Sequence, residues 1–192
     1  IEFTVTDADS GVASIAVTLD GTAISSITKT AVTGGYKCTC KPASALKDGS
    51  HTISITATDN DGNTSAAKTS TFMVDTVPPT LSITAPAEGL VTNKTTVTVT
   101  GKTDDATSKP VTVTVNGAAA TVGTDGSFSK DVSLSNGANK ITIIATDKAG
   151  KTTTVVRNVT LDTAAPVIKS ISITPNPVDC GKTFIISVEI TD

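Results

Sequence analysis

The sequence repeats itself after about 90 residues, and this repeat constrains the fold more than any other feature. Leu46–Thr64 reads LKDGSHTISITATDNDGNT, and Leu134–Thr152 reads LSNGANKITIIATDKAGKT at a constant offset of 88 positions. The segment Asp75–Pro79 recurs as Asp162–Pro166 at an offset of 87 positions. A period of this length fits one small β domain, so the 192 residues hold two such domains and part of a third.

Proline-containing segments end each repeat and set the expected boundaries. We predict a first unit over residues 1–77 that lacks its leading strand, a complete unit over 78–164, and the leading two strands of a third or strand-donated unit over 165–192. The first unit starts directly in a strand at Ile1–Asp7, which resembles Ile186–Asp192 near the other end of the chain. The chain is therefore either a window cut from a long array of repeats or a unit whose tail completes the first unit of another copy.

Composition and patterning both predict strands. Threonine supplies 38 of the 192 residues, and Thr, Val and Ile fit the pleated surface of a sheet better than a helix. Apolar and polar residues alternate, as at Ile53, Ile55 and Ala57 or at Val111, Val113 and Val115, which is the period of a half-buried strand. We find no helical stripe longer than two turns.

Asn-Gly and Asp-Gly pairs stand between these segments, and such pairs supply the positive φ angles of tight hairpins. The pairs are Asp20-Gly21, Asp48-Gly49, Asp61-Gly62, Asn116-Gly117, Asp125-Gly126 and Asn136-Gly137. Short strands joined by short turns predict an all-β chain of tandem antiparallel β-sandwiches. In the complete unit, the strand phase places these side chains inside: Val97, Val99, Val113, Phe128, Leu134, Ile141 and Ile143.

The middle unit resembles a known family. It reads PPTLSITAPAEGLVTNKTTVTVTGKT, then VTVTVNG, then TDGSFSKDVSLSNGANKITIIATDKAGKTTT, and is similar over residues 78–162 to the bacterial immunoglobulin-like repeats of surface adhesins and secreted glycoside hydrolases, particularly the glucodextranase B-domain type. The first unit resembles related repeats with a TDADSGV turn and a VTLDG hairpin. The resemblance implies seven-stranded Ig-like sandwiches that act as spacer or adhesive modules outside the cell, and it implies no active site.

Charge and hydropathy exclude two classes of partner. The formal net charge is −3, whereas nucleic-acid binding depends on clustered Lys and Arg, so we expect no nucleic acid partner. No apolar run approaches the roughly 18 residues that span a bilayer, so we expect no membrane insertion. The chain opens in a strand without a signal peptide, which suggests an excised piece of a longer protein.

Three cysteines suggest a disulfide without fixing its connectivity. Cys38 and Cys40 lie at i and i+2 of one strand, so both point to the same face and are poorly placed to bridge each other. Cys180 lies six positions before Ile186, which aligns with Ile1. A bridge from Cys180 to Cys38 or Cys40, within a domain or across copies, competes with three reduced thiols, and the family resemblance favours the oxidised form.

Metal binding has weak support in the sequence. Asp59 and Asp61 resemble part of a calcium loop, but the twelfth position of an EF-hand would be Ser70, and the second repeat carries Lys and Ala in this loop. A hairpin turn explains both loops better. Asp75 and Asp162 lie at unit junctions, where calcium stiffens some extracellular arrays, but we expect no metal and no cofactor.

Catalysis has weaker support still, and we expect no enzyme. His51 is the single imidazole, and it cannot form a triad with Ser50 because neighbours on a strand point to opposite faces. We interpret it as an ordinary surface residue. Asp-rich loops could supply paired carboxylates for glycoside hydrolysis, but such loops are common at sandwich ends; the candidates are Asp7, Asp9, Asp104 and Asp105. The five aromatic residues, expected mostly in cores, are too few for a carbohydrate platform.

The leading interpretation is a non-catalytic extracellular structural or interaction protein, a repeat of a bacterial surface stalk, adhesin or filament. Two alternatives remain: an accessory spacer module of a secreted polysaccharide-degrading enzyme, and an Ig-like phage decoration domain. The expected partners are neighbouring copies or repeats of the chain itself, joined head-to-tail in the strand-donated case. The sequence identifies no surface ligand.

Overall fold

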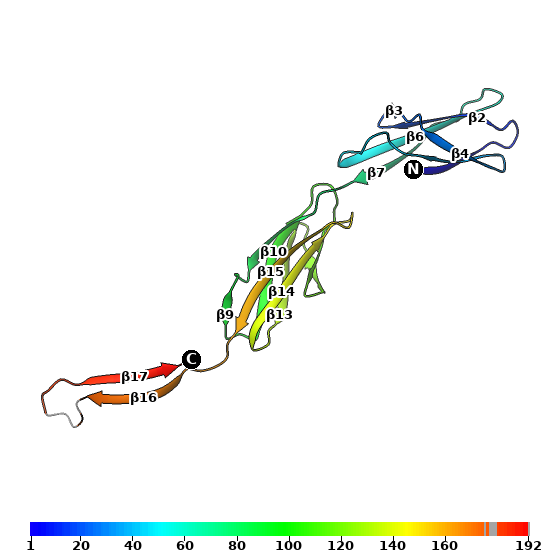
Figure 1. Ribbon diagram of the computed structural model, residues 1–192. Helices are drawn as coiled ribbons and strands as arrows, with labels where there is room; N and C mark the ends of the chain where they lie inside the picture. Colours follow the sequence, from blue (N-terminus) through cyan, green and yellow to red (C-terminus); the bar gives the residue numbers. More distant parts are fainter. Residues whose placement is uncertain (175, 177–179, 192) are drawn as a thin grey trace. The chain divides into compact units, whose positions relative to one another are not determined.

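The computed structural model describes residues 1–174, 176 and 180–191. The sequence places a proline-containing break between the two strands of the tail, and its residues Pro175 and Pro177 lie outside the described residues, as does Asp192. The secondary-structure elements of the described residues are all strands, so the all-β prediction is confirmed (Figure 1). No helix in this part of the chain is long and apolar enough to cross a membrane.

The first sandwich consists of a three-stranded sheet of order β1-β5-β4 and a four-stranded sheet of order β3-β2-β6-β7. Its strands are β1 (Glu2–Thr6), β2 (Val12–Leu19), β3 (Thr22–Ala23), β4 (Ile27–Val32), β5 (Gly35–Cys40), β6 (Gly49–Asp59) and β7 (Lys68–Val74). All of these strands pair antiparallel. Val17, Cys40 and Ile53 form a core between the two sheets, and partly buried apolar residues pack around them.

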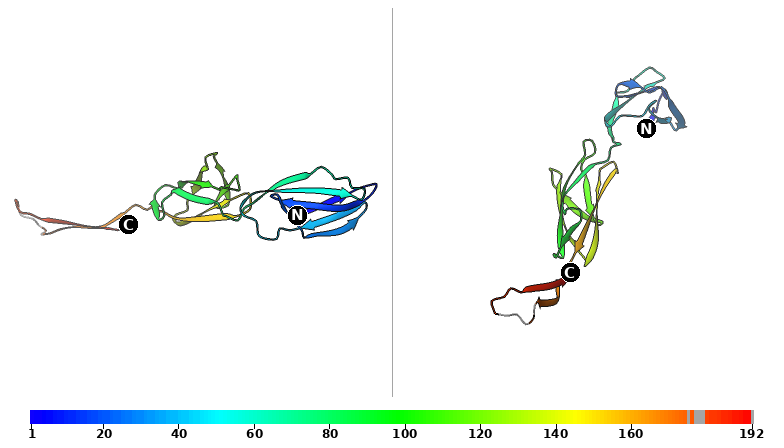
Figure 2. Two further views of the ribbon diagram at one scale, coloured as in Figure 1. Left: turned by 90° about the horizontal axis from the view of Figure 1, so that it is seen from above. Right: turned by 60° about the vertical axis from the view of Figure 1, so that its left-hand side comes forward.

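The second sandwich is one continuous sheet of order β8-β10-β13-β12-β11-β14-β15-β9. Its strands are β8 (Thr80–Ala85), β9 (Leu90–Thr92), β10 (Thr96–Asp104), β11 (Thr112–Val115), β12 (Ala118–Val122), β13 (Ser127–Ser133), β14 (Gly137–Thr146) and β15 (Thr152–Leu161). β12 pairs with both β11 and β13 and so joins two layers (Figure 2). All seven predicted core residues are buried between these layers.

One pairing departs from the antiparallel arrangement that we predicted. β8 lies beside β10, but the short strand β9 runs parallel to β15, with Leu90 opposite Val159. The leading segment of this sandwich thus contributes a strand to each layer. No counterparts of β8 and β9 occur among the described residues of the first sandwich, so β1 and β7 are edge strands there.

Two of the six Asp-Gly and Asn-Gly pairs form two-residue hairpins as expected, whereas Gly49 and Gly137 begin β6 and β14 after connections between strands that do not pair. Asp20 and Gly21 adopt φ angles of 50° and 78° in the β2–β3 hairpin, and Asn116 and Gly117 adopt 48° and 81° in the β11–β12 hairpin. Two consecutive positive φ angles define the turn that matches the twist of two adjacent strands. The turn residues therefore fix the register of both hairpins.

The tail forms a two-stranded hairpin of β16 (Val167–Thr174) and β17 (Ile185–Thr191). Its cross-strand pairs alternate: Ile171–Val188 and Ile173–Ile186 are apolar, whereas Ser170–Glu189 and Ser172–Ser187 are polar. The hairpin is therefore an amphipathic ribbon with one apolar face, and its isoleucines are exposed. Phe184, one of the aromatics expected mostly in cores, is also exposed, because no second sheet among the described residues covers this ribbon.

Candidate metal centre

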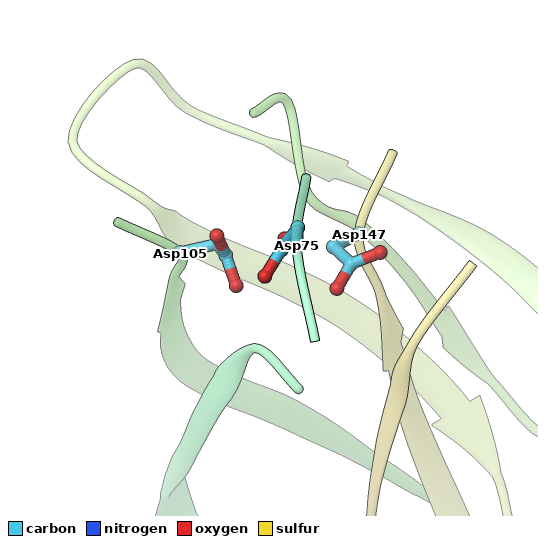
Figure 3. A group of neighbouring side chains, drawn as sticks. All are labelled: Asp75, Asp105 and Asp147. Atoms are coloured by element: carbon cyan, nitrogen blue, oxygen red, sulfur yellow. The ribbon is translucent and has the colours of Figure 1, made fainter. Parts of the chain in front are cut away.

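Three aspartates, each at the end of a strand, bring their carboxylates together. Asp75 follows β7, Asp105 follows β10 and Asp147 follows β14. One ligand oxygen from each lies within 4.8 Å of the other two, and Figure 3 shows the three carboxylates side by side. The contacts of the chain divide it into two compact units, and all three aspartates belong to the same unit, which comprises Ile1–Leu81, Thr103–Thr112 and Ala145–Thr153.

Local hydrogen bonds fix the position of Asp105. Its Oδ1 accepts the backbone N–H of Thr107 at 2.8 Å and of Ser108 at 2.7 Å, and it also accepts the Thr107 hydroxyl at 3.2 Å. These donors, Ser108 first, hold the pKa of Asp105 below its ordinary value. The carboxylate is thus ionised at neutral pH although the residue is only 5% exposed.

The loop after β14 holds Asp147 in a similar way. Its Oδ1 accepts the backbone N–H of Lys151 at 2.9 Å. The N–H of Lys148 donates to the carbonyl of Ser108 at 3.3 Å, which ties this loop to the loop that carries Asp105. Asp75 likewise uses Oδ1, which accepts the N–H of Val77 at 3.1 Å. Each carboxylate is therefore oriented through one oxygen.

The second oxygens of two of these aspartates are left without a donor. Oδ2 of Asp75 and Oδ2 of Asp147 are buried and have no hydrogen-bond partner among the described residues. Asp147 as a whole is 6% exposed. A buried carboxylate oxygen without a partner is costly, and neighbouring carboxylates add repulsion. An all-oxygen cluster of this kind can hold a hard cation.

The calcium-loop candidates of the sequence form turns. Oδ1 of Asp59 accepts the N–H groups of Asp61 and Asn63, and its Oδ2 accepts the side-chain amide of Asn63 at 2.9 Å. Asp7 accepts N–H groups from the turn that contains Asp9. These bonds lower the pKa of both Asp7 and Asp59, chiefly through Gly11 for Asp7 and through Asn63 for Asp59. Asp104, which the sequence offered with Asp7, Asp9 and Asp105 as a carboxylate for glycoside hydrolysis, pairs with Lys109 at 2.8 Å.

The sequence repeat contained a partial signal for the cluster. The repeat aligns Asp147 with Asp59 and places Asp75 at a unit junction, but nothing in it links either residue with Asp105. The sequence does not show that three segments so far apart converge. Nor does it show that the second oxygens of Asp75 and Asp147 are buried.

His51 is part of a structural clamp and is not the ordinary surface residue that we expected. Its Nδ1 lies 2.7 Å from Oδ2 of Asp20, and its Nε2 lies 2.8 Å from the carbonyl oxygen of Lys47. Its ring also packs on Phe72 with 5.6 Å between ring centroids. Asp20, and then the Lys47 carbonyl, raise the pKa of His51. Both acceptors are oxygens, so the doubly protonated ring satisfies both bonds.

All three cysteines are thiols in this single chain. Cys38 and Cys40 are buried on the same face of β5, and Cys180 is exposed. Burial raises the pKa of the Cys38 thiol, which makes that thiol less reactive. A bridge between Cys180 and Cys38 or Cys40 stays a prediction.

Comparison with known proteins confirms the resemblance seen in the sequence. Residues 1–76 match the family model of the bacterial Ig-like domain, and residues 79–163 match that of glucodextranase, domain B. Two consecutive segments of the chain therefore match bacterial Ig-like module families, and the second segment matches the glucodextranase B-domain type. Modules of these families are typical of secreted and surface proteins and are typically non-catalytic accessory domains.

Individual relatives match parts of the chain. Bacillopeptidase F from Bacillus subtilis (strain 168) is 39% identical over 126 residues, which are 66% of this chain and 9% of the relative. The fibronectin(III)-like modules of Clostridium thermocellum CbhA match with a TM-score of 0.47 and 19% identity, over 84% of this chain and 85% of that one. A tetra-tandem repeat from the extending region of a large adhesion protein matches with a TM-score of 0.39 and 21% identity, over 98% and 57%. The chain spans less than a tenth of the length of the curated relative.

Proposed function

We propose that the chain is a non-catalytic spacer segment of a secreted or surface-exposed bacterial protein. One observation carries the proposal: two Ig-like modules follow each other over residues 1–76 and 79–163 with almost no sequence between them. Short proline-containing links of this kind are stiff, so consecutive modules act as a spacer of defined length. The partners of the segment are then its neighbouring modules.

The curated relative favours a particular setting. Bacillopeptidase F is, by its name, a peptidase, so the segment fits an accessory region that positions the catalytic domain of a secreted hydrolase. A polysaccharide-degrading enzyme, a surface adhesin or stalk and a phage decoration domain remain the other settings. The proposed role of the modules is the same in all four settings, because none of these settings requires a catalytic group on the modules.

Module replacement in the natural protein tests the spacer role. We expect that deletion of residues 1–163 impairs the activity or surface presentation of the natural protein. Replacement of the same residues by an unrelated tandem of two Ig-like modules should restore it. A replacement that fails as badly as the deletion would show that these residues themselves bind a ligand or react, and the spacer role would be wrong.

The second candidate function is self-assembly by strand donation, and a groove in the first sandwich favours it. The groove has a volume of about 550 Å³ and lies along β1, β6 and the segment that leads into β7. Phe3, Val5 and Ile55 are among its lining residues. In the second sandwich β8 and β9 pair with the strands that correspond to β1 and β7. The groove therefore lies where a leading strand equivalent to β8 or β9 would pair in the first sandwich.

The tail provides a matching strand. Ile171–Thr174 of β16 reads ISIT, and Leu81–Thr84 of β8 reads LSIT. The isoleucines of β16 are exposed, and an edge strand with open N–H and C=O groups accepts such a segment through main-chain hydrogen bonds. We therefore name β16 of a second copy as the occupant. Because donor and acceptor are different surfaces, the contact is head-to-tail and propagates unless it closes.

Light scattering during size-exclusion chromatography tests this assembly. The wild-type chain should form concentration-dependent oligomers, and Ile171→Lys with Ile173→Lys should abolish them. Ser170→Lys with Ser172→Lys, on the polar face of the same strand, is the matched control and should leave assembly intact. Non-reducing gels would show whether Cys180 becomes bridged. A wild-type chain that stays monomeric at its highest soluble concentration would contradict strand donation and would leave the spacer role untouched.

A further inference from the structure

We infer that Asp75, Asp105 and Asp147 form a calcium-binding site. The inference does not depend on the spacer role, and it departs from the sequence-based expectation of no metal. It rests on the convergence of the three ligand oxygens and on the two buried carboxylate oxygens that lack a donor.

The charge balance of the cluster calls for a cation. Three carboxylates meet within 4.8 Å, and the described ion pairs of the chain place no Lys, Arg or His against any of them. Asp105 and Asp147 are more than nine-tenths buried, so water cannot fully screen their mutual repulsion. A bound divalent ion would offset the repulsion between the carboxylates, and the oxygens that lack a hydrogen-bond donor would coordinate it.

The ligand set favours calcium over other divalent ions. Zinc sites usually contain thiolate or imidazole, and this cluster has neither. Calcium accepts six to eight oxygen ligands at about 2.3–2.6 Å in flexible geometry, so two ligands on opposite sides of the ion are about 4.6–5.2 Å apart. The separation of at most 4.8 Å fits that span. Magnesium requires closer oxygens in a nearly octahedral arrangement and usually keeps several bound waters. A buried cluster leaves little room for those waters.

The first sandwich contains an internal comparison for the site. Asp59 aligns with Asp147, but Oδ2 of Asp59 accepts the side-chain amide of Asn63. The residue 88 positions after Asn63 is Lys151, whose backbone N–H donates to Oδ1 of Asp147 and whose side chain donates nothing to Oδ2. An amide thus satisfies in the first loop the oxygen that lacks a donor in the second. This difference assigns the cation to the loop of Asp147 and not to the loop of Asp59 and Asp61, which resembles part of a calcium loop in the sequence.

Calorimetry of the full chain tests the site. After removal of metal with EDTA, titration with CaCl₂ should show one ion per chain, with a dissociation constant of about 10⁻⁴–10⁻³ M, the range of extracellular modules. About 10 mM CaCl₂ should raise the melting temperature by roughly 5–15 °C relative to NaCl of equal ionic strength. MgCl₂ at the same concentration should give a clearly smaller shift.

Variants locate the ion. Asp147→Asn and Asp75→Asn lie on different segments, and each should weaken calcium binding more than about tenfold. Asp104→Asn is the matched control, because Asp104 neighbours Asp105 but pairs with Lys109, and it should bind calcium as the wild type does. Circular dichroism verifies that each variant is folded, and one folded site variant is sufficient for the test. The inference is overturned if the wild type shows neither heat nor a melting shift, if Asp104→Asn loses as much affinity as the site variants, or if magnesium stabilises as strongly as calcium.

Discussion

Asn63 donates its side-chain amide to Oδ2 of Asp59 at 2.9 Å, and the corresponding pair in the second repeat, Lys151 and Asp147, makes no such bond. The two loops otherwise share their backbone hydrogen bonds: the N–H of Asp59 donates to Asn63 and the N–H of Asp147 donates to Lys151. The side chain of Asn63 therefore makes the difference between the two turns: in the first turn both carboxylate oxygens have donors, and in the second turn a buried oxygen has none.

Transferring this amide should make the second loop independent of calcium. We expect Lys151→Asn to donate to Oδ2 of Asp147 and to stabilise the metal-free chain by about 1 kcal/mol, the typical net contribution of one hydrogen bond. The calcium-dependent rise in melting temperature should shrink. Lys151→Ala removes the same charge without adding the amide, and it should keep the full calcium response. Equal behaviour of both variants in scanning calorimetry would argue against the hydrogen-bond explanation.

The clamp between His51 and Asp20 should make stability depend on pH. The pKa of His51 is raised above 6.5 in the fold, so its contribution is complete below that pH and is lost as the pH rises through the raised value. Asp20 has a pKa lowered below 3.8, chiefly by His51, so its contribution is present above pH 3.8 and is lost as the pH falls through the lowered value. The clamp is therefore strongest between about pH 4 and 6.5.

Urea unfolding at two pH values checks this window. His51→Gln should reduce the unfolding free energy more at pH 5.5 than at pH 9, where the wild-type imidazole has lost its proton. Ser50→Ala, at the neighbouring position, should show no such difference between the two pH values. A loss for His51→Gln that is the same at both pH values would mean that packing on Phe72 matters and that the ion pair does not.

Gly101 should tolerate no side chain. A Cβ at this position would overlap the carbonyl oxygen of Ser82 on the neighbouring strand β8 and would come within 2.8 Å of the ring of Phe128. Such overpacking costs about 1–3 kcal/mol. We expect Gly101→Ala to lower the melting temperature and to increase hydrogen exchange in β8. Lys102→Ala, next in the same strand but exposed, should change neither quantity.

The predicted core of the second sandwich should dominate its stability. Ile141 is fully buried, so Ile141→Ala should cost about 2–5 kcal/mol in chemical unfolding. Val91 is exposed on the short strand β9, and Val91→Ala should change stability by less than about 0.5 kcal/mol. Similar losses at the two positions would show that the strand phase does not identify the core.

Strand alternation was sufficient to predict which residues of the second sandwich face its core, because each residue's face depends on its own position in a strand. This is why Ile141 and Val99 are buried as expected. The turn at Asn116 was predictable for a different local reason, because an Asn-Gly pair accommodates two positive φ angles. The cluster of Asp75, Asp105 and Asp147 required knowledge of which strand ends converge, and the spacing of residues along the sequence does not contain it. Phe184 was misjudged for a related reason: it lies just before β17, and its burial would need a covering sheet that the described residues do not include.

The different burial of the three cysteines makes the chain open to selective chemistry. A thiol-specific dye should label Cys180 at once, because this residue is exposed, whereas Cys38 and Cys40 lie in the interior of the first sandwich. The two inner thiols can react only when β5 separates from its neighbours. The rate at which a reagent modifies them in the native protein therefore measures how often this sheet opens, with no denaturant present.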